Sequence, residues 1–323
     1  MYQLSCPSKT FLIGEYAVLD GGHGVVVSTG PRFRVDFKEV AKEEESYVKG
    51  LSPQGPPMDF LKDNLDIFSH FAMDMHDPHE HKGGFGWSSA QFLFLYMIKE
   101  WVRQDKPDIL PKIDRAALLE EFLAYSWDGD GWAPSGLDVL SQLEGKILFL
   151  QSPRKIIDGK VAPIEFSEYY QIKDWPFEDI QFVLLRTGKK VATHSHLSNL
   201  QGIRTSSLGK LAEESGKSLL DKDEEEFIRT INQYKNDLRE QDLVDPASWN
   251  TQQELMQRPE VLAIKGCGAL GADVLLVVVV TELLEDFLEF IEEEEFLVVG
   301  TSETITEGLS FSKIVEETKD LES

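Results

Sequence analysis

The chain has 323 residues, of which 41% are apolar and 28% are charged, and these proportions are those of a folded globular protein rather than a disordered one. Its formal net charge of −25 argues against binding to duplex nucleic acid, because that affinity comes mainly from lysines and arginines that neutralise phosphates. The two cysteines, Cys6 and Cys267, are far apart and form neither a disulfide framework nor a zinc-ligand spacing.

Two features of the sequence bear on where in the cell the protein is found: its N-terminus and the length of its apolar stretches. Residues 1–5 lack the basic region and the long apolar core of a signal peptide. The longest apolar stretch, residues 274–280, is far shorter than the roughly 20 residues that a membrane-spanning helix needs. We therefore expect a soluble cytoplasmic protein with no membrane partner, and the sequence leaves monomer and homodimer both open.

The first 82 residues predict strands followed by an irregular excursion. Apolar runs at residues 11–13 and 24–27 indicate strands, and the alternation over residues 32–40 is typical of an edge or hairpin strand. Between residues 41 and 82 the pattern fades into Gly, Pro, Asp and Glu, with one short helix expected near residues 59–73. We expect this segment to be a mobile excursion.

Four histidines crowd into the end of that excursion: His70, His76, His79 and His81. Histidines beside carboxylates can bind a transition metal, but no strict ligand spacing is present. A mobile polar loop is the simpler interpretation, and a metal site is the alternative.

From residue 83 onward the periodic patterns are strong. Residues 90–102 predict a buried helix, and residues 114–125 predict a second helix with Asp114 as its N-cap. Further strands are expected at residues 146–151, 181–186, 274–280, 296–299 and 308–312, and further helices at residues 197–214, 223–239 and 282–294. Helices segregated against mixed sheets predict the α+β class.

A lysine and a glutamate flank the first apolar run. Lys9 precedes it, and Glu15 and Tyr16 follow Gly14. Phosphoryl transfer needs a cation that stabilises an acceptor oxygen as it loses its proton, and Lys9 has that chemistry. A surface lysine beside a glycine turn is the plain alternative.

A glycine-rich segment, residues 83–86, runs through Trp87, Ser88 and Ser89 into the helix expected from residue 90. Glycines let the backbone approach a polyphosphate, and a helix N-terminus offers N–H groups and a positive dipole end. A serine hydroxyl here would suit Mg²⁺. The segment is not a Walker A loop, because no lysine follows its last glycine. A flexible turn with a serine N-cap is the alternative.

Two later segments add to this pattern. Residues 265–273 are small and permit close backbone packing against a ligand or another loop. Asp138 follows a tight turn at Ser135 and Gly136, where a carboxylate can accept or hold a hydroxyl proton. A helix-capping aspartate is the alternative for Asp138.

In this order, the segments resemble the motifs of the GHMP kinase superfamily. Residues 7–18 are similar to its first motif, residues 84–90 to its second, and residues 265–271 to its third. Residues 135–138 match its Ser-Gly-x-Asp segment, in which the aspartate contacts the acceptor hydroxyl. The resemblance covers residues 5 to about 312. It implies a two-lobed α+β fold, with an N-terminal ribosomal-protein-S5-like domain over residues 1–177 and a C-terminal ferredoxin-like domain over residues 178–323.

The resemblance also implies an ATP-dependent kinase that uses Mg²⁺, and it assigns roles to residues. The catalytic residues would be Lys9 and Asp138. The cofactor-binding residues would be Gly84, Phe85, Gly86, Trp87, Ser88, Ser89 and Ala90. The substrate-binding residues would be Glu15, Tyr16, Ser135, Gly136, Lys189, Lys190, Thr193, His194, Gly268 and Ala269. The metal contacts would be Ser88 and Asp128.

Three details are most similar to phosphomevalonate kinases. Tyr16 stands where mevalonate kinases usually carry histidine, Asp273 follows the third motif, and residues 185–197 are similar to that subfamily's Trp-Thr-Gly-x-x-Ala-x-Thr segment. We therefore expect phosphomevalonate as the acceptor, in isoprenoid precursor synthesis. Mevalonate kinase, or another GHMP sugar or alcohol kinase, is the alternative.

The sequence also departs from the family pattern. Trp87 stands at the first serine position of the second motif, and Leu270 and Ala272 stand where glycine is common. At the spacing expected for a metal carboxylate there is Trp127, with Asp128 and Asp130 nearby. These departures favour a second alternative, a catalytically impaired GHMP-fold protein with a binding or regulatory role.

Overall fold

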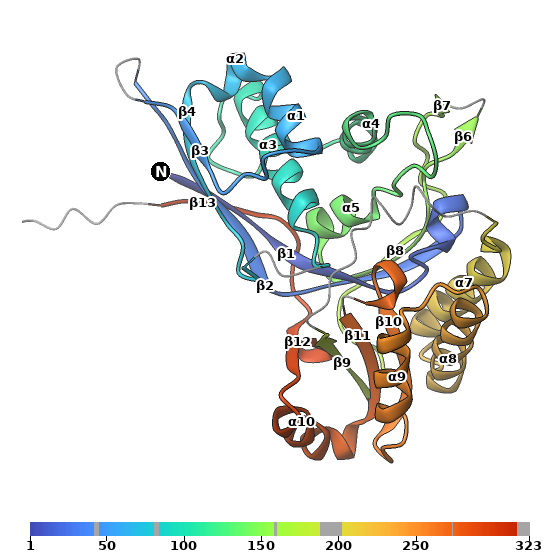
Figure 1. Ribbon diagram of the computed structural model, residues 1–323. Coiled ribbons are helices and arrows are strands. Elements are labelled where there is room, and N and C mark those ends of the chain that lie inside the picture. The colour runs from blue at the N-terminus through green and yellow to red at the C-terminus, as the bar shows by residue number, and fades with distance from the viewer. Residues whose placement is uncertain (42–44, 81–83, 158–159, 188–201, 273, 315–323) are drawn as a thin grey trace, which may run out of the picture.

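The computed structural model describes residues 1–41, 45–80, 84–157, 160–187, 202–272 and 274–314. Over these residues the chain forms a seven-stranded sheet, a four-stranded sheet and a two-stranded ribbon, with helices packed against the larger sheets (Figure 1). The predicted α+β class is confirmed.

The seven-stranded sheet contains β13-β1-β2-β4-β3 in that order, and β5 and β8 continue it from the other half of β2. The four-stranded sheet has the order β10-β11-β9-β12. The strands are β1 (Tyr2–Ile13), β2 (His23–Glu39), β3 (Tyr47–Lys49), β4 (Phe71–His76), β5 (Ile147–Gln151), β6 (Ile156–Ile157), β7 (Lys160–Val161), β8 (Tyr169–Ile172), β9 (Ile180–Arg186), β10 (Val261–Cys267), β11 (Val274–Val280), β12 (Leu297–Thr301) and β13 (Ser310–Lys313).

The helices cover these sheets, and Figure 1 shows α3, α4 and α5 gathered over one face of the first sheet. The α-helices are α1 (Pro56–Asp63), α2 (Leu65–Phe68), α3 (Trp87–Arg103), α4 (Arg115–Ser126), α5 (Leu137–Glu144), α7 (Thr205–Asp221), α8 (Glu224–Glu240), α9 (Pro246–Leu255) and α10 (Leu284–Glu293). The 3₁₀ turns are η1 (Ala17–Asp20), η2 (Ala269–Gly271), η3 (Thr281–Leu283) and η4 (Ser302–Thr304). No helix in these described stretches is both long and apolar enough to cross a membrane.

The centre of the first sheet is the long antiparallel pair β1 and β2. Residues 32–39 belong to β2, which pairs with β1 on one side and with β4 on the other. The hairpin interpretation is therefore confirmed, because β1 and β2 are consecutive antiparallel strands, and the edge interpretation is wrong, because β4 lies on the other side of β2. Phe33, Val35 and Phe37 are buried, while the residues between them face outward or are half-buried. Apolar and polar residues alternate along any strand of a sheet that is covered on one face only. The alternation shows which side chains are buried, and it does not show whether the strand has a partner on one side or on both.

The prediction of a mobile excursion over residues 41–82 was also wrong for the part that the structure describes. This segment contains α1, α2 and β4, and β4 is an interior strand of the first sheet. Phe60 and Phe71 are buried in the core. The elements are only four to eight residues long, so each carries too few residues to show a clear period.

The two helices with the strongest patterns are confirmed. The buried helix expected at residues 90–102 is α3, and the helix expected at residues 114–125 is α4. The Asp114 side chain caps α4 by accepting hydrogen bonds from the N–H groups of Ala116 and Ala117 at 2.9 and 3.4 Å.

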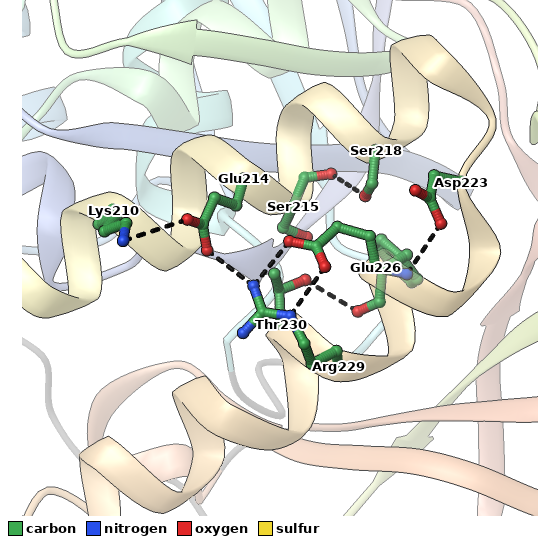
Figure 2. A network of polar contacts seen from close by, with 9 residues as sticks. Lys210, Glu214, Ser215, Ser218, Asp223, Glu226, Arg229 and Thr230 are labelled. Carbon is green, nitrogen blue, oxygen red and sulfur yellow. Dashed lines mark hydrogen bonds and ion pairs between the residues drawn. The ribbon is translucent and has the colours of Figure 1, made fainter.

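Helices α7 and α8 form a polar, partly exposed pair. The helix expected at residues 197–214 is observed from Thr205 to Asp221, and residues 197–201 lie outside the described part. Figure 2 shows Arg229 of α8 between Glu226 of its own helix and Glu214 of α7. Helices α5 and α9 were not predicted, although α5 carries one of the residues that matter most for function.

Candidate active site

A cavity of about 150 Å³ lies where the segments that resemble the three motifs meet. Most of the residues on its wall are ones to which the sequence assigned a role: Lys9, Glu15, Tyr16, Gly84, Ser135, Gly136, Asp138, Gly268 and Ala269. The remaining wall is mainly apolar and consists of Phe11, Leu19, Phe122 and Pro134. Four segments that are far apart in the sequence thus form the wall of one small pocket.

Lys9 and Asp138 form an ion pair on this wall. Lys9 lies on β1 and Asp138 lies in the first turn of α5, and the Lys9 Nζ–Asp138 Oδ1 distance is 2.9 Å. The Lys9 side chain is 11% exposed and that of Asp138 is 38% exposed. The carboxylate can therefore be reached by a small molecule in the cavity, while the lysine is held beside it.

Glu15 forms a second ion pair, with Lys265 of β10. The Lys265 Nζ–Glu15 Oε1 distance is 2.9 Å, and the two side chains are 0% and 8% exposed. Burial by itself lowers the pKa of Lys265, but its neighbours Cys267 and Glu15 outweigh burial and raise that pKa above its ordinary value. The sequence showed Lys265 only as the first residue of a small-residue segment. A charged residue directly before glycines could have marked Lys265 as a site residue. Its partner Glu15 could not be identified in this way, because it lies 250 positions away in the sequence.

Tyr16 joins the same two segments by hydrogen bonds. It is buried, and its hydroxyl accepts a hydrogen bond from the backbone N–H of Leu270 at 3.0 Å. Its own N–H donates to the Tyr234 hydroxyl at 3.5 Å. Tyr16 therefore fastens η2 against the first segment while its side chain contributes to the cavity wall.

The glycine-rich loop is held tightly against Lys9. Gly86 has a φ of +92°, and a Cβ built there would lie 2.8 Å from Gln142 Nε2 and 3.1 Å from Lys9 Cε. Gln142 Nε2 donates to the Gly86 carbonyl at 2.9 Å, and the Lys9 N–H donates to the Phe85 carbonyl at 3.1 Å. The left-handed φ at residue 86 favours glycine, and a Cβ there would require the Gln142 and Lys9 side chains to shift.

The remaining residues of this loop have different environments. Phe85 and Ala90 are buried, and Ser89 donates its hydroxyl to the Gly86 carbonyl at 2.9 Å. Ser88 is exposed at the start of α3. The Trp87 ring is half-buried and packs 5.2 Å from the ring of Phe33. Ser88 is thus the hydroxyl of the pair that faces solvent.

The third segment packs on itself and also contributes to the cavity wall. A Cβ on Gly266 would lie 2.3 Å from the Gly271 carbonyl oxygen, so this part of the segment folds closely on itself. Gly268 and Ala269 instead line the cavity. Close packing of one pair of glycines places the residues between them at the site.

His79 supports the glycine-rich loop from behind, and sequence reasoning missed it. It is buried, its ring stacks on Phe85 at 4.1 Å, and its Nε2 lies 2.6 Å from Ser8 Oγ. Burial lowers the pKa of His79 below its ordinary value. The prediction of a mobile polar loop is therefore wrong for His79, which is buried, and for His76, which is exposed but belongs to β4.

Some predicted residues lie outside the described part of the chain, and others are described but are not on the cavity wall. Lys189, Lys190, Thr193, His194 and Asp273 lie outside the described residues. Asp128 is exposed in the loop after α4 and is not among the residues on the cavity wall. Across the described residues no group of three His, Cys, Asp or Glu side chains could hold a metal ion.

The described residues fit a nucleotide better than a preformed metal centre. Gly84 lines the cavity, and the 17-residue helix α3 begins three residues later. The N–H groups at a helix N-terminus are a suitable environment for phosphate oxygens. Mg²⁺ is commonly bound through one or two protein oxygens together with substrate phosphates. Ser88 is exposed at the start of α3, and the two carboxylates on the cavity wall, Glu15 and Asp138, are already paired with Lys265 and Lys9.

The structure is similar to solved structures of small-molecule kinases. Streptococcus pneumoniae phosphomevalonate kinase in complex with phosphomevalonate and AMPPNP is 12% identical, with a TM-score of 0.69 over 93% of this chain and 99% of that chain. Methanococcus jannaschii mevalonate kinase is 14% identical, with a TM-score of 0.63 over 94% and 98%. Lactococcus lactis galactokinase complexed with galactose is 13% identical, with a TM-score of 0.66 over 95% and 94%.

No protein-family model and no curated protein matches the sequence. The structural likeness spans nearly the whole of each chain and shows that this protein has the α+β fold of the GHMP kinases.

Proposed function

We propose that this protein is an ATP-dependent small-molecule kinase and that its acceptor is phosphomevalonate. The observation that carries the proposal is the Lys9–Asp138 pair, 2.9 Å apart on the wall of a cavity that also includes Gly84 of the glycine-rich loop. A lysine and a reachable carboxylate beside a glycine-rich loop are the groups that phosphoryl transfer to an alcohol requires.

In this proposal the acceptor hydroxyl lies between Lys9 and Asp138. Its oxygen forms a bond to the γ-phosphorus of ATP as the bond from that phosphorus to the β,γ-bridging oxygen breaks, and its proton passes to the Asp138 carboxylate. Lys9 stabilises the negative charge that develops on the acceptor oxygen. The glycine-rich loop and the α3 N-terminus hold the phosphates in line with the acceptor. Mg²⁺ neutralises charge on the phosphates when it is bound.

The acceptor phosphate would be held by Lys189 and Lys190, with Thr193 and His194 beside them. In a protein of net charge −25, a phosphorylated acceptor gains nothing from the global field and depends on such local cations. The phosphomevalonate-kinase-like segment that contains the two lysines supports this part of the proposal.

A second acceptor, unphosphorylated mevalonate, is favoured by one observation. Among the cavity-lining residues that the structure describes, Lys9 is the one cation, and it is already paired with Asp138. A less charged acceptor fits such a wall without further cations.

The test is an ADP-release assay with phosphomevalonate, mevalonate, homoserine and galactose. We expect turnover with phosphomevalonate. A Lys189→Ala, Lys190→Ala double variant should raise KM for phosphomevalonate about tenfold or more and leave KM for ATP unchanged, because charge-assisted contacts to phosphate are lost. A matched control is the Lys210→Ala, Lys217→Ala double variant, which removes two exposed lysines of α7.

A preference for mevalonate, with a double variant that behaves like wild type, would make mevalonate the acceptor. ATP binding without turnover on any of the four alcohols would instead indicate a binding or regulatory protein with this fold.

A further inference from the structure

A second and larger cavity lies next to the first. Its volume is about 590 Å³, within the range of roughly 300–1,000 Å³ that small-molecule sites occupy. It is bounded by the end of η1, by the loop that follows α4, and by the chain that leaves β5. Leu19 lines both cavities, and the loop wall at Trp132 leads within two residues to Pro134 of the first cavity.

The wall of this second cavity contains a buried arginine that is only partly satisfied. Arg154 is 3% exposed, and its Nη2 donates to the carbonyls of Leu19 and Val18 at 2.5 and 3.3 Å. Its Nε is buried and has no hydrogen-bond partner among the described residues. Leaving a buried guanidinium donor unpaired costs free energy. The two carbonyl contacts by themselves therefore do not explain why an arginine stands at this position.

The charged groups around Arg154 do not neutralise the positive charge of the cavity wall. Burial lowers the pKa of Arg154, and the nearby Asp20 raises it, but an arginine in a protein keeps its positive charge. The Asp20 carboxylate accepts a hydrogen bond from Thr205 Oγ1 at 2.8 Å, and Lys155 adds a second cation at the rim. The wall therefore carries two cations, Arg154 and Lys155, and one carboxylate, Asp20, within a strongly acidic protein.

Two tryptophans supply the apolar part of the wall. Trp127 and Trp132 both line the cavity. The indole N–H of Trp127 donates to the Asp130 carbonyl at 2.8 Å, which fixes the orientation of this ring. Large flat rings beside a guanidinium favour a ligand with an apolar body and an anionic group.

We infer that this second cavity binds a small organic anion, a carboxylate or a phosphate ester, whose charged group contacts Arg154 and whose apolar part lies against Trp127 and Trp132. This site is separate from the Lys9–Asp138 pair, and the inference does not depend on the proposed kinase activity. Arg154 also donates to the carbonyl of Leu19, a residue that lines both cavities.

The test is calorimetric titration of the full chain with phenyl phosphate, phenylacetate and the neutral benzyl alcohol. We expect saturable binding of at least one anion at concentrations up to about 10 mM and none of benzyl alcohol. The anion that binds more tightly identifies phosphate or carboxylate as the preferred group. Arg154→Gln should weaken binding about tenfold or more, since it removes the charge-assisted contact. Arg103→Gln, at an exposed arginine of α3, is the matched control and should bind as wild type does.

Arg154 also donates hydrogen bonds to two backbone carbonyls, so its replacement changes the structure as well as the charge of the cavity. A second variant tests the cavity while leaving these hydrogen bonds in place. Lys155→Gln, on the exposed rim, should weaken anion binding several-fold and leave the thermal unfolding temperature unchanged. Lys9→Met should leave binding unchanged. Absence of saturable binding by wild type, or wild-type affinity in both cavity variants, overturns the inference. Loss of binding in Lys9→Met alone also overturns it, because the anion would then occupy the first cavity.

Discussion

The α7–α8 surface and the first cavity hold ion pairs of similar length in opposite surroundings. On the surface, Arg229 lies 2.6 Å from Glu226 and 2.8 Å from Glu214, and its side chain is 50% exposed (Figure 2). At the cavity, Lys265 and Glu15 are 2.9 Å apart and almost fully buried. Exposed pairs contribute about 0–1 kcal/mol, because water and salt screen them and ordering long side chains costs entropy. Breaking a buried pair is far more costly, because it leaves a charge without solvent or partner.

The Lys9–Asp138 pair lies between these extremes. Its lysine is nearly buried, while its carboxylate is more than one-third exposed to the cavity. A fully buried pair cannot meet a substrate, and a fully exposed pair cannot hold a fixed geometry. The comparison shows that the degree of burial, more than the distance, separates the structural pair from the pair suited to chemistry.

The largest expected effect is a loss of catalytic rate at the Lys9–Asp138 pair. Asp138→Asn keeps the shape and removes the charge, so kcat should fall by about 10²–10⁴-fold with little change in unfolding temperature. The measurement is ADP release at saturating substrates, with thermal unfolding alongside. Asp108→Asn, at an exposed aspartate that lines neither cavity, is the matched control. A variant with wild-type kcat would remove Asp138 from the mechanism.

The next effect is on stability, at the buried pair. Lys265→Met should lower the free energy of unfolding by about 3–5 kcal/mol, because Glu15 is then buried without a cation. Urea unfolding measures this change. Adding Glu15→Gln to Lys265→Met removes the uncompensated charge and should recover part of the loss. A single variant as stable as wild type would show that the pair is solvated.

The smallest effect is expected at the surface. Arg229→Gln removes both contacts to Glu226 and Glu214, and the free energy of unfolding should fall by less than about 1 kcal/mol. The difference should shrink further when the same urea titration is repeated at about 1 M salt, where the Debye length is near 3 Å. A loss as large as that of Lys265→Met would contradict the comparison.

The sequence by itself determined the features that depend on local pattern. The α+β class, the buried helix α3 and the Asp114 cap of α4 followed from periodicity and from residue types at helix ends. The order of the glycine-bearing segments indicated which residues to examine, and many of these line one cavity. The helix and the cap were readable because each is encoded in neighbouring residues, and the segments were readable from their order along the chain.

Only the tertiary structure decided which distant residues meet. The pairing of Glu15 with Lys265, the stacking of His79 on Phe85, and the position of Arg154 at a second cavity have no local signal. The same holds for β4, whose six residues are a strand because β2 lies beside them. Contacts of this kind are set by packing of the whole chain, since a side chain's partner, burial and pKa depend on neighbours that the sequence places tens or hundreds of residues away.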